Sequence, residues 1–332
     1  MTAPLLEALH KRFPKARITY VLGGAAHPFF KDGIKILNNN PHVDKCVKSD
    51  RFILHEILKD KPFDLCIDLC GGKVSNLISR LSGAKINFRG RFRQRPSEFF
   101  YSYCTKQGGL KTFRFSIPKG LTRAACFMSI LDKIGMPASG LIAPRIYLSS
   151  REKEYSSRFL KKIKKTNKIV IGMHPGGRFK SRLWGVKNYG MLADMLVKEL
   201  SAEVIVFHGP GEEFYVNSVC GAATERLRKV FKNDIRKDLA ILSGCDFFIS
   251  SDGGPLHMAL SLGVPSVGLF KNKKAMRYWF DAYKQTGCLN HFFIHGNKTK
   301  EAEKVFKKIK HILKDRHMAI KASDEKNRIQ SF

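Results

Sequence analysis

The sequence is poor in acidic side chains and has no long apolar run. It contains 60 lysine and arginine residues against 28 aspartate and glutamate residues, a formal net charge of +32. That imbalance argues for an acidic partner, such as a nucleic acid, an anionic membrane face or a phosphorylated substrate. No apolar stretch approaches the roughly 20 residues that a membrane-spanning helix needs. Charged residues also come too early for a signal peptide, so we expect any membrane contact to be peripheral.

Cysteine spacing typical of a zinc site is also missing. The eight cysteines are scattered, mostly inside apolar runs, and Cys66 and Cys70 have no matching second pair. We therefore expect reduced, buried thiols in a cytoplasmic protein that holds no metal. The glycine-containing loop that begins at His174 has neither the Walker Gly-Lys-Ser/Thr ending nor the G-x-G-x-x-G spacing, so neither nucleotide fingerprint applies.

Strands and helices alternate through both halves of the chain. A length of 332 residues suits two domains of about 150 residues each. Such alternation implies parallel sheets with helices on both faces. We predict an α/β protein with two Rossmann-like, doubly wound domains at residues 1–150 and 151–332. A short strand is expected at 144–148, an exposed helix within 149–167, and a basic C-terminal helix whose tail frays after Leu313.

The N-terminal half opens on a helix, which is unusual for this architecture. Doubly wound domains normally begin with a strand that becomes central in the sheet, whereas here an amphipathic helix is predicted from Pro4 to Phe13. Either the domain is built differently or residues upstream of Met1 are missing. The predicted N-terminal domain therefore lacks its first strand.

The stretch from Ser250 to Leu260 carries the strongest chemical signal. A buried strand at 245–249 runs into Asp252-Gly253-Gly254-Pro255-Leu256-His257, which starts an apolar helix. Two glycines let a ligand approach the backbone, and the free N–H groups of a helix start favour an anion. His257 falls in the first helical turn and can face the same ligand. Taken alone, however, an ordinary turn capped by Asp252 explains the motif equally well.

Two further polar turns follow predicted strands. The loop from His174 to Trp184 contains glycines and several cations and could hold a phosphate. The turn from Gly209 to Glu213 places acidic groups after the next strand. Because ligands of parallel sheets bind at the carboxyl ends of the strands, all three turns should lie on one edge of one sheet. Their shared position is harder to attribute to chance than any single turn.

Four arginines alternate along the segment from Phe88 to Arg95. An extended chain would point Arg89, Arg91, Arg93 and Arg95 the same way. Arginine can grip phosphates or carboxylates with two hydrogen bonds, so the spacing suits an acidic ligand. A solvated sheet edge protected by charge is the alternative.

Together these motifs resemble glycosyltransferase family nine, the lipopolysaccharide heptosyltransferases of GT-B fold. The likeness rests on the residues at 174–177 with Trp184, on the turn at 209–213, and above all on 252–259 with Gly263-Val264-Pro265 behind it. Weaker N-terminal matches lie at 2–6 and 12–14. The resemblance covers the second half of the chain densely.

The resemblance implies an inverting transfer of heptose from an ADP-activated donor to the inner core of lipopolysaccharide. The resemblance places the reaction on the cytoplasmic membrane face, with ADP-heptose as donor and an acidic lipopolysaccharide acceptor. We expect the chain to be a monomer that uses neither cofactor nor metal. The implied donor-binding residues, in the C-terminal domain, are Gly176, Gly177, Lys180, Ser181, Arg182, Glu212, Glu213, Asp252, Gly253, Gly254 and His257. The implied acceptor-binding residues, in the N-terminal domain, are Lys73, Arg89, Arg91, Arg93 and Arg95.

Two departures from the family pattern affect the chemistry. Arg182 stands where the family commonly has a lysine, which preserves the charge but alters the geometry. The base that an inverting transfer needs is, in the family, an aspartate in a loop before the first helix, and this chain does not contain that loop. Asp68, at the end of a predicted strand, is the nearest candidate, and its alternative role is to cap a turn.

Two other functions remain open on the sequence alone. A truncated or inactive homologue would bind a nucleotide sugar without transferring it. A nucleic-acid-binding protein rests on net charge only, since no recognition motif supports it, and we expect no nucleic-acid partner.

Overall fold

The computed structural model describes most of the chain, in two compact units. The described residues are 2–22, 33–48, 53–60, 62–70, 72–91, 111–116, 122–133, 143–163, 168–230, 234–294 and 299–329. The first unit contains Met1–Leu148 and Arg277–Gln285, and the second contains Ser149–Met276 and Thr286–Phe332. Within the described ranges, no helix has the length and apolar character needed to span a membrane.

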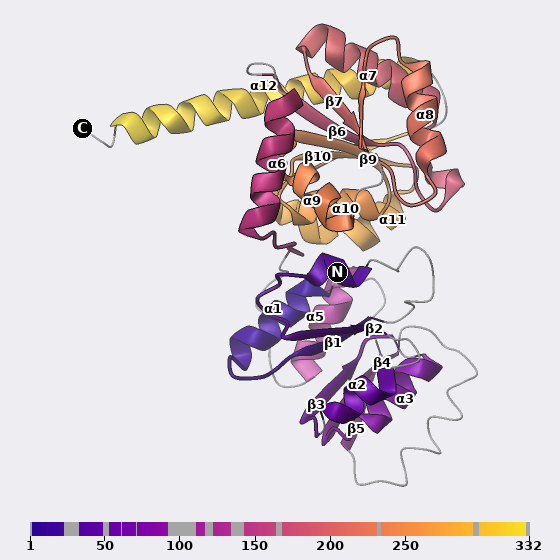
Figure 1. Ribbon diagram of the computed structural model, residues 1–332, viewed down its shortest axis with the longest axis vertical. Helices are drawn as coiled ribbons and strands as arrows, with labels where there is room; N and C mark the ends of the chain where they lie inside the picture. Colours follow the sequence, from indigo (N-terminus) through magenta and orange to yellow (C-terminus); the bar gives the residue numbers. More distant parts are fainter. Residues whose placement is uncertain are drawn as a thin grey trace. The chain divides into compact units, whose positions relative to one another are not determined.

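The second unit is built on one parallel sheet of six strands in the order β11-β10-β9-β6-β7-β8 (Figure 1). Parallel pairing is recorded for all five neighbouring pairs. The strands are β6 (Val170–His174), β7 (Glu203–Val206), β8 (Arg228–Lys229), β9 (Phe247–Ser251), β10 (Ser266–Phe270) and β11 (Leu289–Phe293).

Helices cover both faces of this sheet, as predicted for a doubly wound domain. One apolar cluster joins the strands to α7 (Val186–Leu200), α8 (Glu213–Ala222) and α12 (Thr299–Ile329). A second cluster, on the opposite face, joins them to α6 (Ser150–Ile163), α9 (Ile235–Ser243) and α10 (Gly254–Ser261). Because both faces are covered, the central strands are continuous apolar runs.

Alternation along each strand divides its side chains between the two clusters. On β6, Val170 belongs to one cluster and Ile171 to the other, and both are fully buried. Gly172 faces the aromatic rings of Phe248 and Phe207, and a Cβ there would lie 2.8 and 3.0 Å from them. Glycine at this position therefore lets two bulky rings pack directly against β6.

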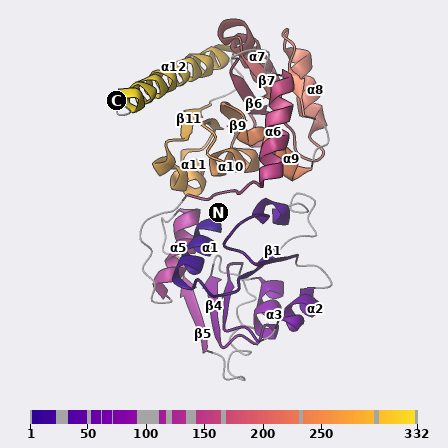
Figure 2. The same cartoon turned by 60° about the vertical axis from the view of Figure 1, so that its left-hand side comes forward.

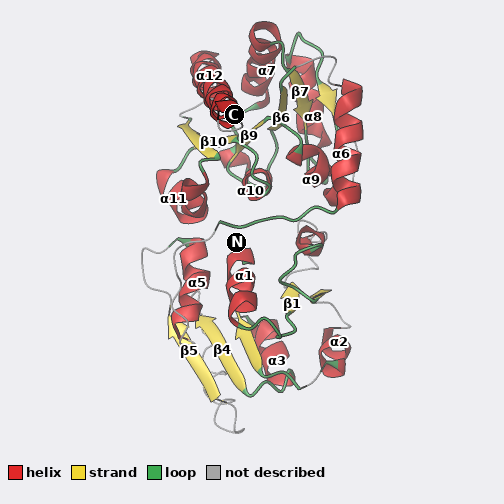
Figure 3. Cartoon of the chain, turned by 90° about the vertical axis from the view of Figure 1, so that its left-hand side faces the viewer, coloured by secondary structure: helices red, strands yellow, loops and turns green. Residues whose placement is uncertain are grey.

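The strands of the first unit form two smaller parallel sheets. One contains β1 (Thr19–Leu22) and β2 (Lys45–Lys48), and the other has the order β3-β4-β5. The second sheet consists of β3 (Leu65–Asp68), β4 (Ile86–Arg91) and β5 (Lys111–Ser116), and Figure 3 shows β4 and β5 side by side. The remaining elements are α1 (Ala3–Arg12), the 3₁₀ helix η2 (Gly33–Leu37), α2 (Ile53–Lys59), α3 (Lys73–Leu81) and α5 (Arg123–Lys133).

Helices also cover these smaller sheets. Leu5 of α1 and Leu131 of α5 pack with Phe88 of β4. Ile57 of α2 and Ile78 of α3 form a separate cluster with the strands β1 and β2. The mixed α/β fold with parallel sheets is thus confirmed, although the described strands of this unit form two sheets rather than one.

Three local predictions differ from the structure. Residues 144–148 form no strand; in the described part of the chain no strand pairs with them, and they lead into the second unit. The helix within 149–167 is only half exposed, because Phe159, Leu160 and Ile163 pack against the sheet. The C-terminal segment stays helical to Ile329 instead of fraying after Leu313, and Figure 2 shows it extending beyond the sheet.

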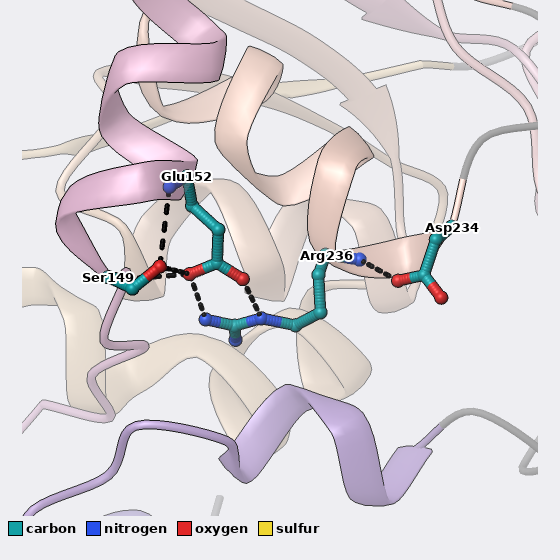
Figure 4. Close-up of polar contacts among 4 residues, drawn as sticks. All are labelled: Ser149, Glu152, Asp234 and Arg236. Atoms are coloured by element: carbon teal, nitrogen blue, oxygen red, sulfur yellow. Dashed lines mark hydrogen bonds and ion pairs between the residues drawn. The ribbon is translucent and has the colours of Figure 1, made fainter.

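A buried ion pair anchors the point where the chain enters the second unit (Figure 4). Glu152, in the first turn of α6, accepts hydrogen bonds from the backbone N–H and the hydroxyl of Ser149, at 2.7 and 3.0 Å. Arg236 donates from Nε and Nη2 to both oxygens of that carboxylate, at 2.7 and 2.8 Å. Asp234 caps α9 by accepting from the backbone N–H of Arg236. The start of α6 is therefore tied to the start of α9.

We predict that Arg236→Met destabilises the second unit. The side chain of Arg236 is 9 % exposed and that of Glu152 20 %, so removal of the guanidinium takes two charge-assisted hydrogen bonds away from a carboxylate that is mostly shielded from water. Hydrogen bonds to charged groups contribute about 1.5–3 kcal/mol, and we expect a loss of that size in the free energy of unfolding. Urea unfolding followed by tryptophan fluorescence measures this loss, because Trp184 is fully buried in this unit.

The matched control is Arg158→Met on α6, the helix that carries Glu152. Arg158 pairs with Glu154 at 3.8 Å, and both side chains are about two-thirds exposed, so the change should cost less than about 1 kcal/mol. Equal losses in the two variants would contradict the anchoring role of Arg236.

Candidate functional site

The candidate site lies where the order of the strands reverses. From β6 the chain adds β7 and β8 on one side, then crosses over to add β9, β10 and β11 on the other. The last residue of β6, His174, is paired in register with Ser250 of β9. In open parallel sheets this reversal leaves a crevice outside the carboxyl ends of the two central strands. The three polar turns all follow strands of this sheet and share this edge, as predicted.

Trp184 anchors the loop that follows β6. The indole is fully buried, and its Nε1–H donates to Glu301 of α12 at 3.2 Å. Its ring packs edge-on against Tyr189, with 5.3 Å between the centroids. Asn188 donates to the Trp184 carbonyl at 3.0 Å. With its end fixed, the loop leaves Lys180 and Ser181 exposed on a short 3₁₀ helix, η3 (Lys180–Arg182).

A buried carboxylate joins this loop to the turn after β7. Glu212 Oε2 lies 3.3 Å from Nε2 of His174 and accepts a hydrogen bond from the N–H of Gly209 at 2.8 Å. Burial acts to raise the pKa of Glu212, but the contacts with His174 and Gly209 outweigh it and hold the pKa below the ordinary value. A Cβ on Gly176 would lie 2.7 Å from the same oxygen. Gly176 is therefore needed to make room for this carboxylate.

The two neighbouring glutamates consequently have different surroundings. Glu212 is buried and occupied within the chain, whereas Glu213 is exposed in the first turn of α8. The sequence could not separate them, since either one could have reached a ligand. Of the two, Glu213 has the side chain accessible to a bound molecule.

The turn after β9 connects directly to the loop after β6. Arg182 Nη1 donates to Asp252 Oδ2 at 3.0 Å. Burial raises the pKa of Asp252, although Arg182 opposes that shift. Ser251, at the end of β9, shares a 3.1 Å hydrogen bond with the buried hydroxyl of Tyr189. Arg182 therefore joins the loop to the turn, and Tyr189 joins α7 to the end of β9 in the core.

The two glycines at the start of α10 are not required by the described parts of the chain. A Cβ on Gly253 would lie 3.7 Å from its nearest neighbour, Pro255, and a Cβ on Gly254 would lie 3.7 Å from Met258. Both are ordinary van der Waals distances. The φ angle of Gly253 is 177°, an extended conformation open to any residue. Alanine would fit at both positions, so the reason for glycine is to be sought in a molecule that approaches the backbone.

The start of α10 offers free donors for such a molecule. No side chain caps this helix at Gly253. Pro255 has no N–H and the N–H of His257 bonds to the Gly253 carbonyl, so the donors at this helix start are the N–H groups of Gly254 and Leu256. Burial lowers the pKa of His257, in the first turn, to about 3. The imidazole is therefore a neutral hydrogen-bonding group at pH 7 rather than a cation.

The predicted residues of the first unit are only partly described. Asp68 is 5 % exposed, and its two oxygens accept from the N–H of Cys70 and the hydroxyl of Ser75, at 2.8 and 3.0 Å. Those contacts are the geometry of a turn cap, the alternative role predicted for it. Lys73 opens α3, and Arg89 and Arg91 lie on β4. Arg93 and Arg95 fall outside the described residues.

Several supporting residues were not predicted from the sequence. The sequence predicts neither the contact between His174 and Glu212 nor a role for Tyr189 and Phe179. The signals in the sequence are that His174 directly follows an apolar strand and opens the motif at 174–177, and that Phe179 lies in the glycine-containing loop. Among the described residues, no group of three or more histidine, cysteine, aspartate or glutamate side chains could hold a metal ion.

Comparison with known proteins identifies the family of this chain. The model of glycosyltransferase family 9 (heptosyltransferase) matches residues 51–310, more than half of the chain. Lipopolysaccharide heptosyltransferase 3 of Escherichia coli is 22% identical over 287 residues, which cover 81% of this chain and 79% of that protein.

Solved structures of such proteins share the fold. The Escherichia coli ADP-heptose lipopolysaccharide heptosyltransferase II has a TM-score of 0.73 and 17% identity, with 95% of each chain covered. Escherichia coli heptosyltransferase WaaC with ADP has a TM-score of 0.68 and 14% identity, and the match covers 93% of this chain and 94% of that one.

We predict that Glu212→Gln lowers stability while Glu213→Gln does not. Both contacts of the Glu212 carboxylate, with His174 Nε2 and with the Gly209 N–H, are made by Oε2. A glutamine can keep an oxygen in that position but loses the negative charge that strengthens both contacts, which should cost about 1–2 kcal/mol in the free energy of unfolding. Because the pKa of Glu212 is below 4.5 in the folded chain, its charged form adds stability above about pH 4.5 that is lost on further acidification. Urea unfolding at pH 7 and pH 4 measures both effects.

Glu213→Gln is the matched control, since it makes the same chemical change one residue away on an exposed side chain. Equal stability of the two variants at pH 7 would contradict the role of Glu212 in joining the loops.

Proposed function

The chain belongs to glycosyltransferase family 9, and from that premise we propose that it transfers heptose, or a related sugar, from an ADP-activated donor. The proposed acceptor is the inner core of lipopolysaccharide or a related envelope glycan, and the reaction inverts the configuration of the sugar. One observation carries this proposal. The edge of the six-stranded sheet presents an uncapped helix start with two glycines that its described surroundings do not require.

That helix start is suited to the diphosphate of the donor. Gly253 and Gly254 let phosphate oxygens approach the backbone, and the N–H groups of α10 can donate to them. Lys180, Ser181 and Arg182 lie on the neighbouring loop and add two positive charges and a hydroxyl. The leaving group is a nucleoside diphosphate that gains negative charge as the sugar departs. Fixed N–H donors and cations stabilise that charge most strongly in the transition state.

We assign Glu213 to the nucleoside end of the donor. Its carboxylate is exposed at the start of α8, beside the turn after β7, and a carboxylate can accept hydrogen bonds from both ribose hydroxyls. A relative of the same fold has been solved with ADP, which supports ADP as the nucleotide. Glu212 would act only by holding the two loops together.

The acceptor is assigned to the first unit. Arg89 and Arg91 lie on β4 with alternate spacing, and Lys73 opens α3. With Arg93 and Arg95 they would bind the acidic groups of the acceptor through charge-assisted hydrogen bonds. An anionic acceptor embedded in a membrane also suits a net charge of +32 and peripheral contact with the cytoplasmic face.

A second candidate function is nucleotide-sugar binding without transfer. It is favoured by the engagement of Asp68, whose carboxylate already accepts two hydrogen bonds within its own turn. A carboxylate in that position is poorly placed to remove a proton from an acceptor hydroxyl. The two functions share the donor site and differ only in the second half of the reaction.

We predict that the purified full chain binds ADP and transfers heptose from ADP-heptose to a heptose-deficient lipopolysaccharide acceptor. Calorimetry measures the binding and radiolabelled donor measures the transfer. Binding with no transfer would select the second candidate, and the absence of ADP binding would refute both. Asp68→Asn should leave any transfer nearly unchanged if Asp68 only caps its turn.

We also predict that Gly253→Ala weakens ADP binding but leaves folding intact. The added methyl group fits the protein but blocks the approach of a phosphate to the backbone, which removes a hydrogen bond to a charged group. Such bonds contribute about 1.5–3 kcal/mol, so the dissociation constant should rise about tenfold or more. The melting temperature should stay close to that of the unmodified chain.

Gly221→Ala on α8 is the control for this change. A Cβ there meets nothing within 4 Å, so neither ADP affinity nor folding should suffer. Unchanged ADP affinity in Gly253→Ala would show that no ligand approaches this backbone.

A further inference from the structure

Phe179 is an unusually exposed aromatic residue in the loop after β6. Its side chain is 49 % exposed, although burial of a phenylalanine would stabilise the fold. The Arg182 guanidinium lies over its ring at 4.6 Å from the centroid, and the Arg178 guanidinium at 5.4 Å. Both distances are within the range of a favourable cation–π contact. The exposed ring of Phe179 is therefore in contact with two guanidinium groups.

Arg182 is held on a second side by Asp252. The Nη1–Oδ2 distance is 3.0 Å, and the side chain of Asp252 is 9 % exposed, whereas that of Arg182 is 40 % exposed. In the described parts of the chain, no further hydrogen bond of this guanidinium is recorded. Nη1 of Arg182 is thus bound to the carboxylate of Asp252, and one face of the guanidinium lies on the ring of Phe179. The other N–H donors of Arg182 remain open to solvent.

This arrangement has an energetic consequence for anion binding. A free arginine side chain loses about 2 kcal/mol of rotamer entropy when a ligand immobilises it. A guanidinium already fixed by a ring and a carboxylate has lost much of that freedom before the ligand arrives. The pairing also offsets the negative charge of Asp252, which would otherwise repel an anion at the start of α10.

We propose that Phe179 and Asp252 are positioning residues, which hold the guanidinium of Arg182 ready to bind a phosphate group of the donor. This inference rests on the proposed function, because it assumes that a diphosphate binds at this edge of the sheet. It assigns a role to Phe179, and it makes the effect of Phe179 depend on the presence of Arg182. It also explains why an arginine serves here, since only a guanidinium offers further N–H donors in the same plane as the one bound to Asp252.

The first test is calorimetric binding of inorganic pyrophosphate and of ADP to the full chain at fixed ionic strength. Phe179→Leu keeps an apolar side chain but removes the π face. An exposed cation–π contact predicts about two- to fivefold weaker binding of both ligands. Phe214→Leu is the matched control, because Phe214 is 71 % exposed and its recorded ring contact is with Tyr215. It should bind both ligands as tightly as the unmodified chain.

A double-mutant cycle separates positioning from a direct contact. In an Arg182→Gln background, Phe179→Leu should have no further effect on pyrophosphate binding, because the group that it positions is gone. An equal loss with and without Arg182 would overturn the inference. A merely structural loss would also appear in the melting temperature, which should be the same in Phe179→Leu and Phe214→Leu.

For Asp252→Asn, a positioning role and simple charge repulsion predict opposite changes in the affinity for pyrophosphate. Pyrophosphate carries no sugar, so its binding reports only on the anion site. If Asp252 positions Arg182, the variant should bind pyrophosphate several-fold more weakly; tighter binding would show that the carboxylate merely repels anions and would overturn the inference. Failure of the unmodified chain to bind either ligand would refute the donor site as well, whereas binding without any coupling to Phe179 would refute this inference alone.

Discussion

The parallel pairing of β6 with β9 is the constraint on which the proposed site depends. Val170 at the start of β6 and Asp246 just before β9 are 76 residues apart in the sequence, and the backbone N–H of Val170 donates to the side chain of Asp246 at 2.7 Å. Because the two strands run in the same direction, the loops that follow them begin side by side, with His174 opposite Ser250. A one-residue shift in register would move every side chain of the strand to the other face. The rings of Phe248 and Phe207 pack directly against Gly172, and a shift would replace this glycine by a residue with a side chain for which there is no room. The core of the sheet therefore fixes the positions of the polar loops.

Buried polar contacts then fix the positions of the loops at this shared edge of the sheet. Glu212 ties the loop after β6 to the turn after β7, and Tyr189 ties α7 to the end of β9. Trp184 closes the first loop by bonding to α12. Each of these groups lies below the exposed residues that would meet a ligand. Preorganised sites of this kind bind more tightly because less conformational entropy is lost on binding.

The resemblance of the motifs to glycosyltransferase family 9 was confirmed by the family model, and the α/β fold by solved structures of that family. Those predictions succeeded because periodicity in apolar residues and glycine-bearing turns are local properties of a sequence. The predictions that were wrong were also made from local sequence patterns. Residues 144–148 have the composition of a strand, but a strand forms only when a neighbour is available to pair with it. The tail after Leu313 looked polar enough to fray, yet helix-favouring residues and an i,i+4 pair of His311 with Asp315 accompany a continuous helix.

The sequence by itself determined the alternation of strands and helices, the family and the three turns that gather at one edge of a sheet. Tertiary structure decided what each polar residue of those turns does. Glu212 and Glu213 are adjacent and chemically identical, but only one meets His174 and Gly209, because the side chain at 212 turns into the sheet and the one at 213 turns to solvent. Likewise, Arg182 and Asp252 are 70 residues apart, and no pattern along the chain indicates that they touch. Burial and pairing depend on which residues folding brings together, and that information is carried by the packed sheet rather than by any short stretch of sequence.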